Sequence, residues 1–75
     1  MRAYVLINVR AGKSRNVVKG LRKLKGVKSA DVCWGRPDLF VLVDVASEKA
    51  LAQTVLDKIQ ALDGVESTDT HLVIS

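Results

Sequence analysis

The turn Gly35-Arg36-Pro37-Asp38 holds the residues of this chain that are best suited to bind a small charged molecule. Glycine permits a positive φ or the close approach of another backbone, and proline stiffens a turn. The carboxylate of Asp38 can hold an ammonium group, while backbone N–H groups hold a carboxylate. A free α-amino acid carries both charges on one carbon, so this turn predicts an amino-acid site if it meets a neighbouring subunit. Taken alone, the same residues also suit an ordinary hairpin turn.

The other reactive residue types are too few and too scattered to form a catalytic or metal-binding set. His71 is the only imidazole, and beside Asp69 it is interpreted as a surface residue of a strand. Cys33 is the only cysteine, and we expect it to be a small buried hydrophobic residue of a reduced, cytoplasmic protein. Gly12-Lys13-Ser14 lacks the upstream spacing of a phosphate-binding loop. We therefore predict a protein that is not an enzyme and needs no metal or cofactor.

Two similar halves of the chain must position the turn. Leu24-Lys25-Gly26-Val27 returns as Leu62-Asp63-Gly64-Val65, so the offset from Leu24 to Leu62 is 38 residues. Apolar stripes predict two helices, which we expect Ser14 and Ser47 to cap and Gly26 and Gly64 to end. Alternating and β-branched residues predict strands, at Tyr4–Val9, Val27–Trp34, Leu39–Val45 and Ser67–Ile74.

The order of these elements predicts the fold. It is an α+β domain of the ferredoxin-like βαββαβ type, in which two helices cover one face of a four-stranded antiparallel sheet. The length of 75 residues fits a single domain, which we place at residues 1–75. In this topology the first and third strands are central. The scaffold is that of the dimeric α+β barrels, and it serves binding and assembly more often than catalysis.

The sheet face that the helices leave open is also predicted to be apolar. Its side chains on the two central strands are Tyr4, Leu6, Phe40 and Leu42. An antiparallel sheet with a wet second face should carry polar residues there. Covering a few hundred Å2 of apolar surface is worth several kcal/mol at roughly 25 cal/mol per Å2, which is comparable to the whole stability of so small a domain. We therefore predict a two-fold homodimer that packs sheet against sheet through these residues.

Charge is divided unevenly between the halves. Residues 1–37 hold ten Lys and Arg with one acid, and residues 38–75 hold two Lys with seven acids. The basic half favours nucleic acid as a partner. Oppositely charged patches on one small domain favour self-association instead. Solvated helix faces explain the uneven charge without any partner. The basic residues gather on the first helix, and the central strands lack the motifs of an RNA-binding sheet. We expect no direct DNA binding, and the sequence shows no signal peptide or membrane span.

The chain resembles the effector-binding domain of the Lrp/AsnC (feast/famine) transcription regulators, also called the RAM domain. The marks of the resemblance are Ala3–Val9, Gly26-Val27, the Gly-x-x-Asp turn Gly35–Asp38, Gly64-Val65, Thr68-x-Thr70 and Leu72–Ile74. They cover nearly the whole chain, and their order and spacing together are more specific than any one of them. One departure is Pro37, where the family usually has an aromatic residue.

The resemblance implies a dimer that assembles further into an octamer or decamer and binds amino acids in clefts between dimers. By position, Gly35 and Asp38 would touch the ligand, with Arg36 and Pro37 in the same turn, and Thr68 and Thr70 would offer hydroxyls. The chain resembles the stand-alone form without the DNA-binding helix-turn-helix, and a full-length regulator or a metabolic enzyme would be its partner. A purely structural assembly module, a small dimeric α+β barrel enzyme and a nucleic-acid-binding domain stay open as alternatives.

Overall fold

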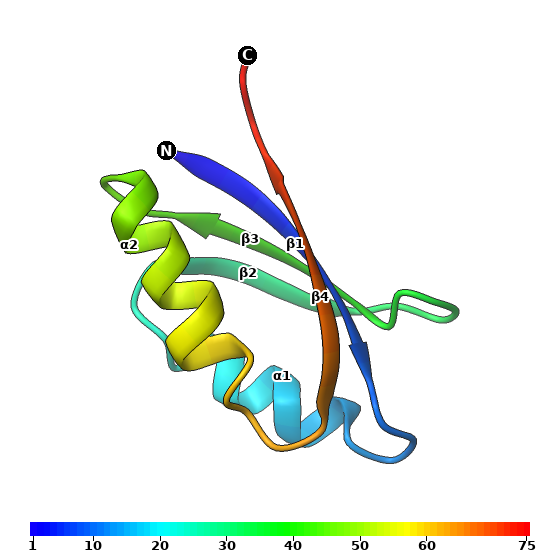
Figure 1. Ribbon diagram of the computed structural model, residues 1–75. Coiled ribbons are helices and arrows are strands. Elements are labelled where there is room, and N and C mark those ends of the chain that lie inside the picture. The colour runs from blue at the N-terminus through cyan, green and yellow to red at the C-terminus, as the bar shows by residue number, and fades with distance from the viewer.

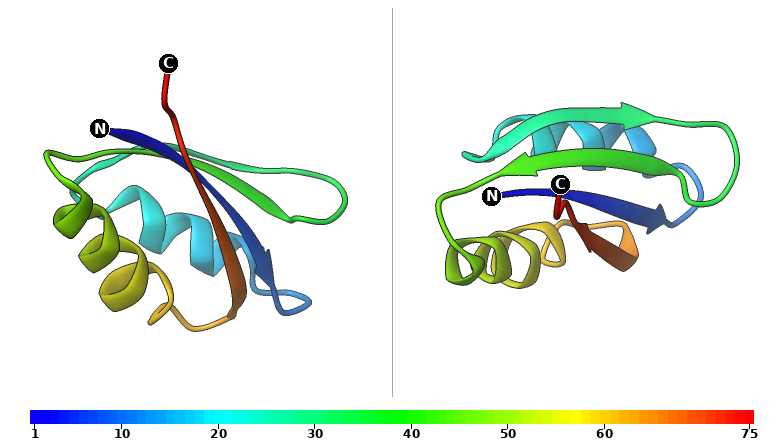
Figure 2. Two further views of the ribbon diagram at one scale, coloured as in Figure 1. Left: turned by 45° about the horizontal axis from the view of Figure 1, so that its top comes forward. Right: turned by 90° about the horizontal axis from the view of Figure 1, so that it is seen from above.

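Four strands form one antiparallel sheet in the order β2-β3-β1-β4 in the computed structural model, which describes residues 1–75 (Figure 1). The strands are β1 (Arg2–Val9), β2 (Val27–Val32), β3 (Leu39–Asp44) and β4 (Val65–Leu72). The helices are α1 (Ser14–Arg22) and α2 (Glu48–Gln53), which continues into the π-helix η1 (Thr54–Ile59). Both helices lie on one face of the sheet, and the other face is left open (Figure 2). The predicted ferredoxin-like α+β fold is confirmed.

Strand residues alternate between a buried helix face and an open face. In the central pair, Val5 of β1 lies opposite Val41 of β3, and both are fully buried under the helices. The next pair, Leu6 and Phe40, points to the open face. The helices contribute the stripes that the sequence predicts, so the core contains Val17, Val18, Leu21, Leu51, Val55 and Ile59. In the edge strand β2 only Ala30 is buried.

The second helix departs from a regular α-helix. Gln60 donates its backbone N–H to the carbonyl of Val55, five residues earlier, at 2.9 Å, which is the bond of a π-helix. The wider turn buries Thr54 beside Val55. Leu62 lies beyond the helix but is still packed against the core. None of the helices has the length and apolar character needed to cross a membrane.

One of the two predicted helix caps is wrong. Ser14 is already the first residue of α1, and Lys13 in the N-cap position has helical φ and ψ with no side-chain bond. An N-cap side chain needs an extended backbone to reach back to the helix. Ser47 has that backbone, with φ of −154° and ψ of 166°, and its hydroxyl accepts from the N–H of Ala50 at 3.1 Å. The expected cap at Ser47 is confirmed.

The hairpin between β2 and β3 is longer than the sequence predicts. β2 ends at Val32, so Cys33 and Trp34 lie in the loop and are both exposed. The expectation that Cys33 is buried is therefore wrong. The reason is that Cys33 lies two residues after Asp31, which pairs with Phe40 on the open face, so alternation directs its side chain to that uncovered face. Cys33 donates its N–H to the carbonyl of Asp38 at 2.7 Å, the last hydrogen bond before the loop. β4 is also shifted, since it begins at Val65 and ends at Leu72.

Gly64 brings the start of β4 against the start of α1. It has a φ of +104°, and a Cβ built on it would lie 2.6 Å from the Cβ of Lys13. Gly12 also has a positive φ, of +81°, but a Cβ there would meet nothing within 4 Å. The two glycines therefore share the need for a left-handed backbone, and only Gly64 adds a close contact.

We expect Gly64→Ala to destabilise the protein at least twice as much as Gly12→Ala. Left-handed backbone alone costs a non-glycine residue about 1–2 kcal/mol, and in Gly64→Ala the side chain of Lys13 must also move. Urea unfolding of both variants at one protein concentration measures the difference. Equal losses would mean that the close approach of Gly64 to Lys13 contributes nothing.

Candidate functional site

Asp38 closes the end of the sheet beside the hairpin loop. Its Oδ2 accepts a hydrogen bond from the N–H of Val9 at 2.8 Å, and its own N–H donates to the carbonyl of Ile7 at 2.9 Å. Arg36 lies in the same turn, with Nη1 3.4 Å from Asp38 Oδ2 and Nη2 3.4 Å from Glu66 on β4. The second oxygen of the Asp38 carboxylate, Oδ1, has no hydrogen-bond partner in the chain and can accept from a ligand.

The rest of the predicted turn is shaped without contacts to the core. Gly35 has a φ of +123°, and a Cβ on it would meet nothing within 4 Å. A glycine is therefore favoured here by its backbone conformation and not by a lack of space for a side chain. Pro37 is half-buried, and the peptide bond between Arg36 and Pro37 is cis.

Thr68 and Thr70 lie on the other side of the sheet from the open face. In β4 they pair with Ile7 and Val5, whose side chains are buried under the helices, so the two threonines share that face. Thr68 Oγ1 accepts a hydrogen bond from Gln60 Nε2 at 2.9 Å. No hydrogen bond joins either threonine to the Gly35–Asp38 turn. Within one chain the structure therefore does not assemble these two predicted groups into one site.

Asn8 is a residue that the sequence analysis did not single out. It lies on β1 facing the open side, where its Nδ2 donates to Ser67 Oγ at 3.0 Å. Its Oδ1 is buried and has no partner, which is costly unless something donates to it. The signal that was available is a lone amide in the otherwise apolar run Tyr4–Val9. Asn8 lies next to Val9, which donates to Asp38.

The four predicted interface residues form one continuous patch on the open face. Leu6 of β1 pairs with Phe40 of β3, and two residues earlier on β1, Tyr4 pairs with Leu42. Tyr4 is 48% exposed and Phe40 is 41% exposed, although both side chains are large and aromatic. Asp31 on β2 and Asp69 on β4 flank the row of Leu6 and Phe40 at its two ends. The open face therefore has an apolar centre and an acidic rim.

His71 is exposed on β4, as predicted, and its Nε2 lies 2.9 Å from Asp69 Oδ2. No group of three His, Cys, Asp or Glu residues is placed so that it could hold a metal ion. The chain has two pockets, and none of the six predicted ligand residues lines either of them. His71 is therefore a surface residue that hydrogen-bonds to Asp69 on its own strand.

Asp63 joins the loop before β4 to the loop before α1. Its carboxylate lies 2.9 Å from Arg10 Nη2 and 3.1 Å from Lys13 Nζ. Hydrogen bonds from Arg10 and then Lys13 lower the pKa of Asp63 below its ordinary value of 3.8. A carboxyl group with a lowered pKa in the folded state stabilises the fold above its unfolded pKa, and that contribution is lost as the pH falls through the folded value.

We therefore expect Asp63→Asn to be less stable than the natural chain at pH 7 and to approach it in stability as the pH falls below about 4. The effect is modest because the group is exposed to water. Urea unfolding of both proteins between pH 7 and pH 2.5 measures it. A stability difference that is the same at both ends of this range would mean that the ion pairs of Asp63 contribute nothing.

Comparison with known proteins agrees with this architecture. The family model described as the Lrp/AsnC ligand binding domain matches residues 2–75. An uncharacterized HTH-type transcriptional regulator of Pyrococcus abyssi is 33% identical over 73 residues, covering 97% of this chain and 46% of the regulator. A second such regulator, from Pyrococcus furiosus, is 32% identical and is covered to 49%. The chain thus spans about half the length of these curated relatives.

Solved structures show the same likeness over the whole chain. The hypothetical protein PHS023 from Pyrococcus horikoshii superposes with a TM-score of 0.91 and 34% identity, covering 99% of this chain and 89% of that one. TTHA0845 from Thermus thermophilus has a TM-score of 0.94 and 30% identity, covering 99% of this chain and 92% of that one. E. coli AsnC has a TM-score of 0.92 and 27% identity over 50% of its length. With its βαββαβ sheet and the family match over residues 2–75, this chain belongs to the Lrp/AsnC ligand-binding domain family.

Proposed function

We propose that this protein is an effector-binding and oligomerisation module that binds a free α-amino acid and takes part in the regulation of transcription or of amino-acid metabolism. The observation that supports this most is the match to a ligand-binding domain family over residues 2–75. The matched segment makes up about half of relatives named as HTH-type transcriptional regulators. This relationship supports a regulatory role for the chain rather than catalysis.

The first element of the proposal is a homodimer through the open sheet face. Tyr4, Leu6, Phe40 and Leu42 form an apolar patch on the two central strands, and nothing within the chain covers it. A two-fold axis through this patch would bury the same residues of both copies. At roughly 25 cal/mol per Å2, removing a few hundred Å2 of apolar surface from water supplies several kcal/mol.

The second element is an amino-acid site that needs more than one chain. Asp38 Oδ1 is free to accept from the ligand's ammonium group, and the open turn at Gly35 leaves room for a ligand to reach the backbone. Thr68 and Thr70 lie on the helix face of β4, and neither forms a hydrogen bond with that turn. A cleft between dimers, in which one chain offers the turn and another offers β4, would bring both groups to one ligand.

This arrangement explains how a ligand would act. An amino acid bound between dimers has a higher affinity for the assembled state than for separate dimers, so it shifts the population toward an octamer or decamer. The assembled form would then associate with a full-length regulator or with a metabolic enzyme. Direct DNA binding by this chain is not part of the proposal.

The test uses Asp38→Asn rather than an alanine substitution. The amide oxygen can still accept from the N–H of Val9 and keep the sheet end closed, but the charge that attracts an ammonium group is lost. We expect at least one of the twenty amino acids to raise the melting temperature of the natural chain. Loss of a charge-assisted hydrogen bond should weaken that ligand roughly tenfold or more in Asp38→Asn.

Asp31→Asn is the matched control, because it removes one carboxylate from the same hairpin outside the turn. It should bind the amino acid as the natural chain does. Native mass spectrometry in parallel reports the assembly state. If no amino acid changes either the melting temperature or the mass, the protein is an assembly module without an effector and the sensing proposal is wrong.

A further inference from the structure

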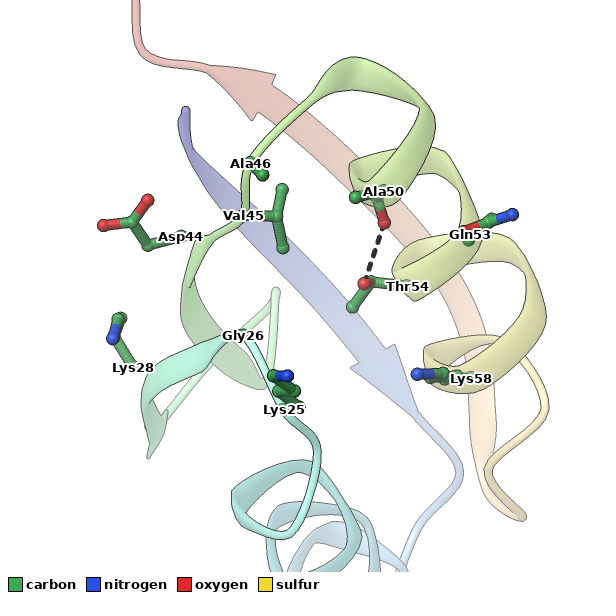
Figure 3. Close-up of a pocket in the computed structure, with 10 residues that line it drawn as sticks. All are labelled: Lys25, Gly26, Lys28, Asp44, Val45, Ala46, Ala50, Gln53, Thr54 and Lys58. Carbon is green, nitrogen blue, oxygen red and sulfur yellow. Dashed lines mark hydrogen bonds between the residues drawn. The ribbon is translucent and has the colours of Figure 1, made fainter.

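The larger of the two pockets lies at the end of the sheet opposite the Gly35–Asp38 turn. It has a volume of about 650 Å3 and opens where the loop before β2, the end of β3 and the helix α2–η1 meet (Figure 3). That volume falls in the usual range for a site that holds a small molecule. β2 and β3 are six residues long, so roughly 20 Å of strand separates this pocket from the turn.

Three lysines from three different segments line this pocket. They are Lys25 in the loop before β2, Lys28 on β2 and Lys58 on η1. In Figure 3 the side chain of Lys58 extends from η1 toward the side of the pocket where Lys25 lies. None of the three forms a salt bridge or a side-chain hydrogen bond within the chain, whereas Arg10, Lys13 and Arg36 all do.

The one acid of the lining does not neutralise these lysines. Asp44 and Lys28 both point away from the centre of the pocket, where Lys25 and Lys58 lie (Figure 3), and Asp44 Oδ1 lies 3.5 Å from the N-terminal ammonium group of Met1. The pocket therefore presents an excess of positive charge that the chain itself leaves uncompensated. A bound anion would supply the missing charge.

The remainder of the lining is partly apolar, and part of it lies on the irregular helix α2–η1. Val45, Ala46 and Ala50 give the apolar part. Thr54 is 5% exposed and donates its hydroxyl to the carbonyl of Ala50 at 2.9 Å, so it is held in place. Thr54 and Lys58 are both residues of the π-helix η1, and π-helical turns are found frequently at functional sites.

We propose that this pocket binds a small molecule that carries a phosphoryl group and a short apolar part. A phosphate monoester has a charge between about −1.5 and −2 at pH 7, and lysine binds phosphate as a point charge. The α-ammonium and α-carboxylate groups of a free amino acid cancel each other's charge at this pH, so they match a cluster of lysines less well than a phosphate does. The pocket lies away from the open sheet face, so a dimer formed through that face leaves it accessible. It is a second site, independent of the proposed amino-acid site.

The proposal is tested with n-butyl phosphate as the probe, added to the natural chain at low salt and followed by the backbone amide signals in nuclear magnetic resonance. We expect a saturable shift of the amides around Gly26, Val45 and Thr54. In the double variant Lys25→Gln/Lys58→Gln the affinity should fall roughly tenfold or more, because two charge-assisted contacts are lost. Asp38→Asn should bind the probe as the natural chain does.

The control is Lys19→Gln/Lys23→Gln, which removes the same charge from an exposed residue of α1 and from its C-cap, both outside the pocket. It should keep most of the affinity, and sodium chloride at matched ionic strength should not shift the three amides. The four lysines are exposed, so both double variants should fold, and the dispersion of their amide signals shows whether they do. An equal loss of affinity in the two variants, or the absence of a saturable shift in the natural chain, would overturn the proposal.

Discussion

Replacing Tyr4 with aspartate should convert the proposed dimer into a monomer. Tyr4 is one of the four residues of the apolar patch and is 48% exposed in the single chain, so the substitution leaves the core of each copy intact. In a two-fold interface the change occurs twice, and each copy loses an aromatic contact and must desolvate a carboxylate. We expect a loss of about 4 kcal/mol or more in dimerisation, which is roughly a thousandfold in Kd. Size-exclusion chromatography with light scattering measures the mass.

Tyr4 is a better choice than Phe40 for this experiment. Phe40 pairs with Asp31 across the strands, so a carboxylate at that position would also meet a like charge within its own chain. Tyr4 pairs with Leu42 and His71 and has no such neighbour. Leu56→Asp is the control, because Leu56 is exposed on the helix side of the molecule. It should remain a dimer, and an unchanged mass in Tyr4→Asp would place the interface elsewhere.

Replacing Ile7 with alanine should remove a large share of the free energy of unfolding. Ile7 is fully buried on the helix face of the central strand β1, and removing a buried isoleucine side chain costs about 2–5 kcal/mol. A domain of this size has a free energy of unfolding of only about 4–11 kcal/mol. Urea unfolding at a fixed protein concentration measures the loss, since an oligomer's stability depends on concentration.

Ile74→Ala is the matched control for this substitution. Ile74 lies after the end of β4 and is 91% exposed, so the same chemical change should alter the free energy of unfolding by less than about 0.5 kcal/mol. Comparable losses in the two variants would contradict the register that places Ile7 in the core.

The fold could be predicted because its signals are repeated along the chain. The two-residue alternation of Val5, Ile7 and Val9, and of Leu39, Val41 and Val43, places a buried face on each central strand. The glycines Gly26 and Gly64 occur at the same place in both halves, and both have a positive φ. These local preferences and the burial of the core agree with one another, which is the condition under which sequence predicts structure.

The predictions that are wrong concern positions where the type of side chain does not determine the backbone conformation. Cys33 and Trp34 are apolar enough to continue β2, but the chain turns at Gly35, which has a φ of +123°, and the hydrogen bond from Cys33 to Asp38 is the last one before it. Ser14 has a capping side chain, yet the residue before it is already helical. The apolar residues Leu51, Val55 and Ile59 are spaced by four, as on one face of an α-helix. This spacing does not reveal that the backbone hydrogen bonds of η1 join residues five apart.

The site was predicted less completely than the fold for a different reason. The turn at Gly35–Asp38 and the threonines of β4 lie in places that one chain does not bring together. Asn8 and the three pocket lysines were not singled out, because a polar residue in a strand or an exposed lysine is common in any sequence. Asn8 is distinguished only by its unpaired acceptor, and the lysines only by lining one pocket from three segments. Both features depend on the folded chain.

In the proposed dimer, two sheets pair through Tyr4, Leu6, Phe40 and Leu42. Sedimentation equilibrium of the purified natural chain tests this pairing more directly than the study of any variant. Pairing predicts a mass of at least twice the 8.2 kDa of one chain, in even multiples, across the accessible concentration range. A single species of 8.2 kDa at high concentration would contradict the dimer, and with it the amino-acid cleft between subunits.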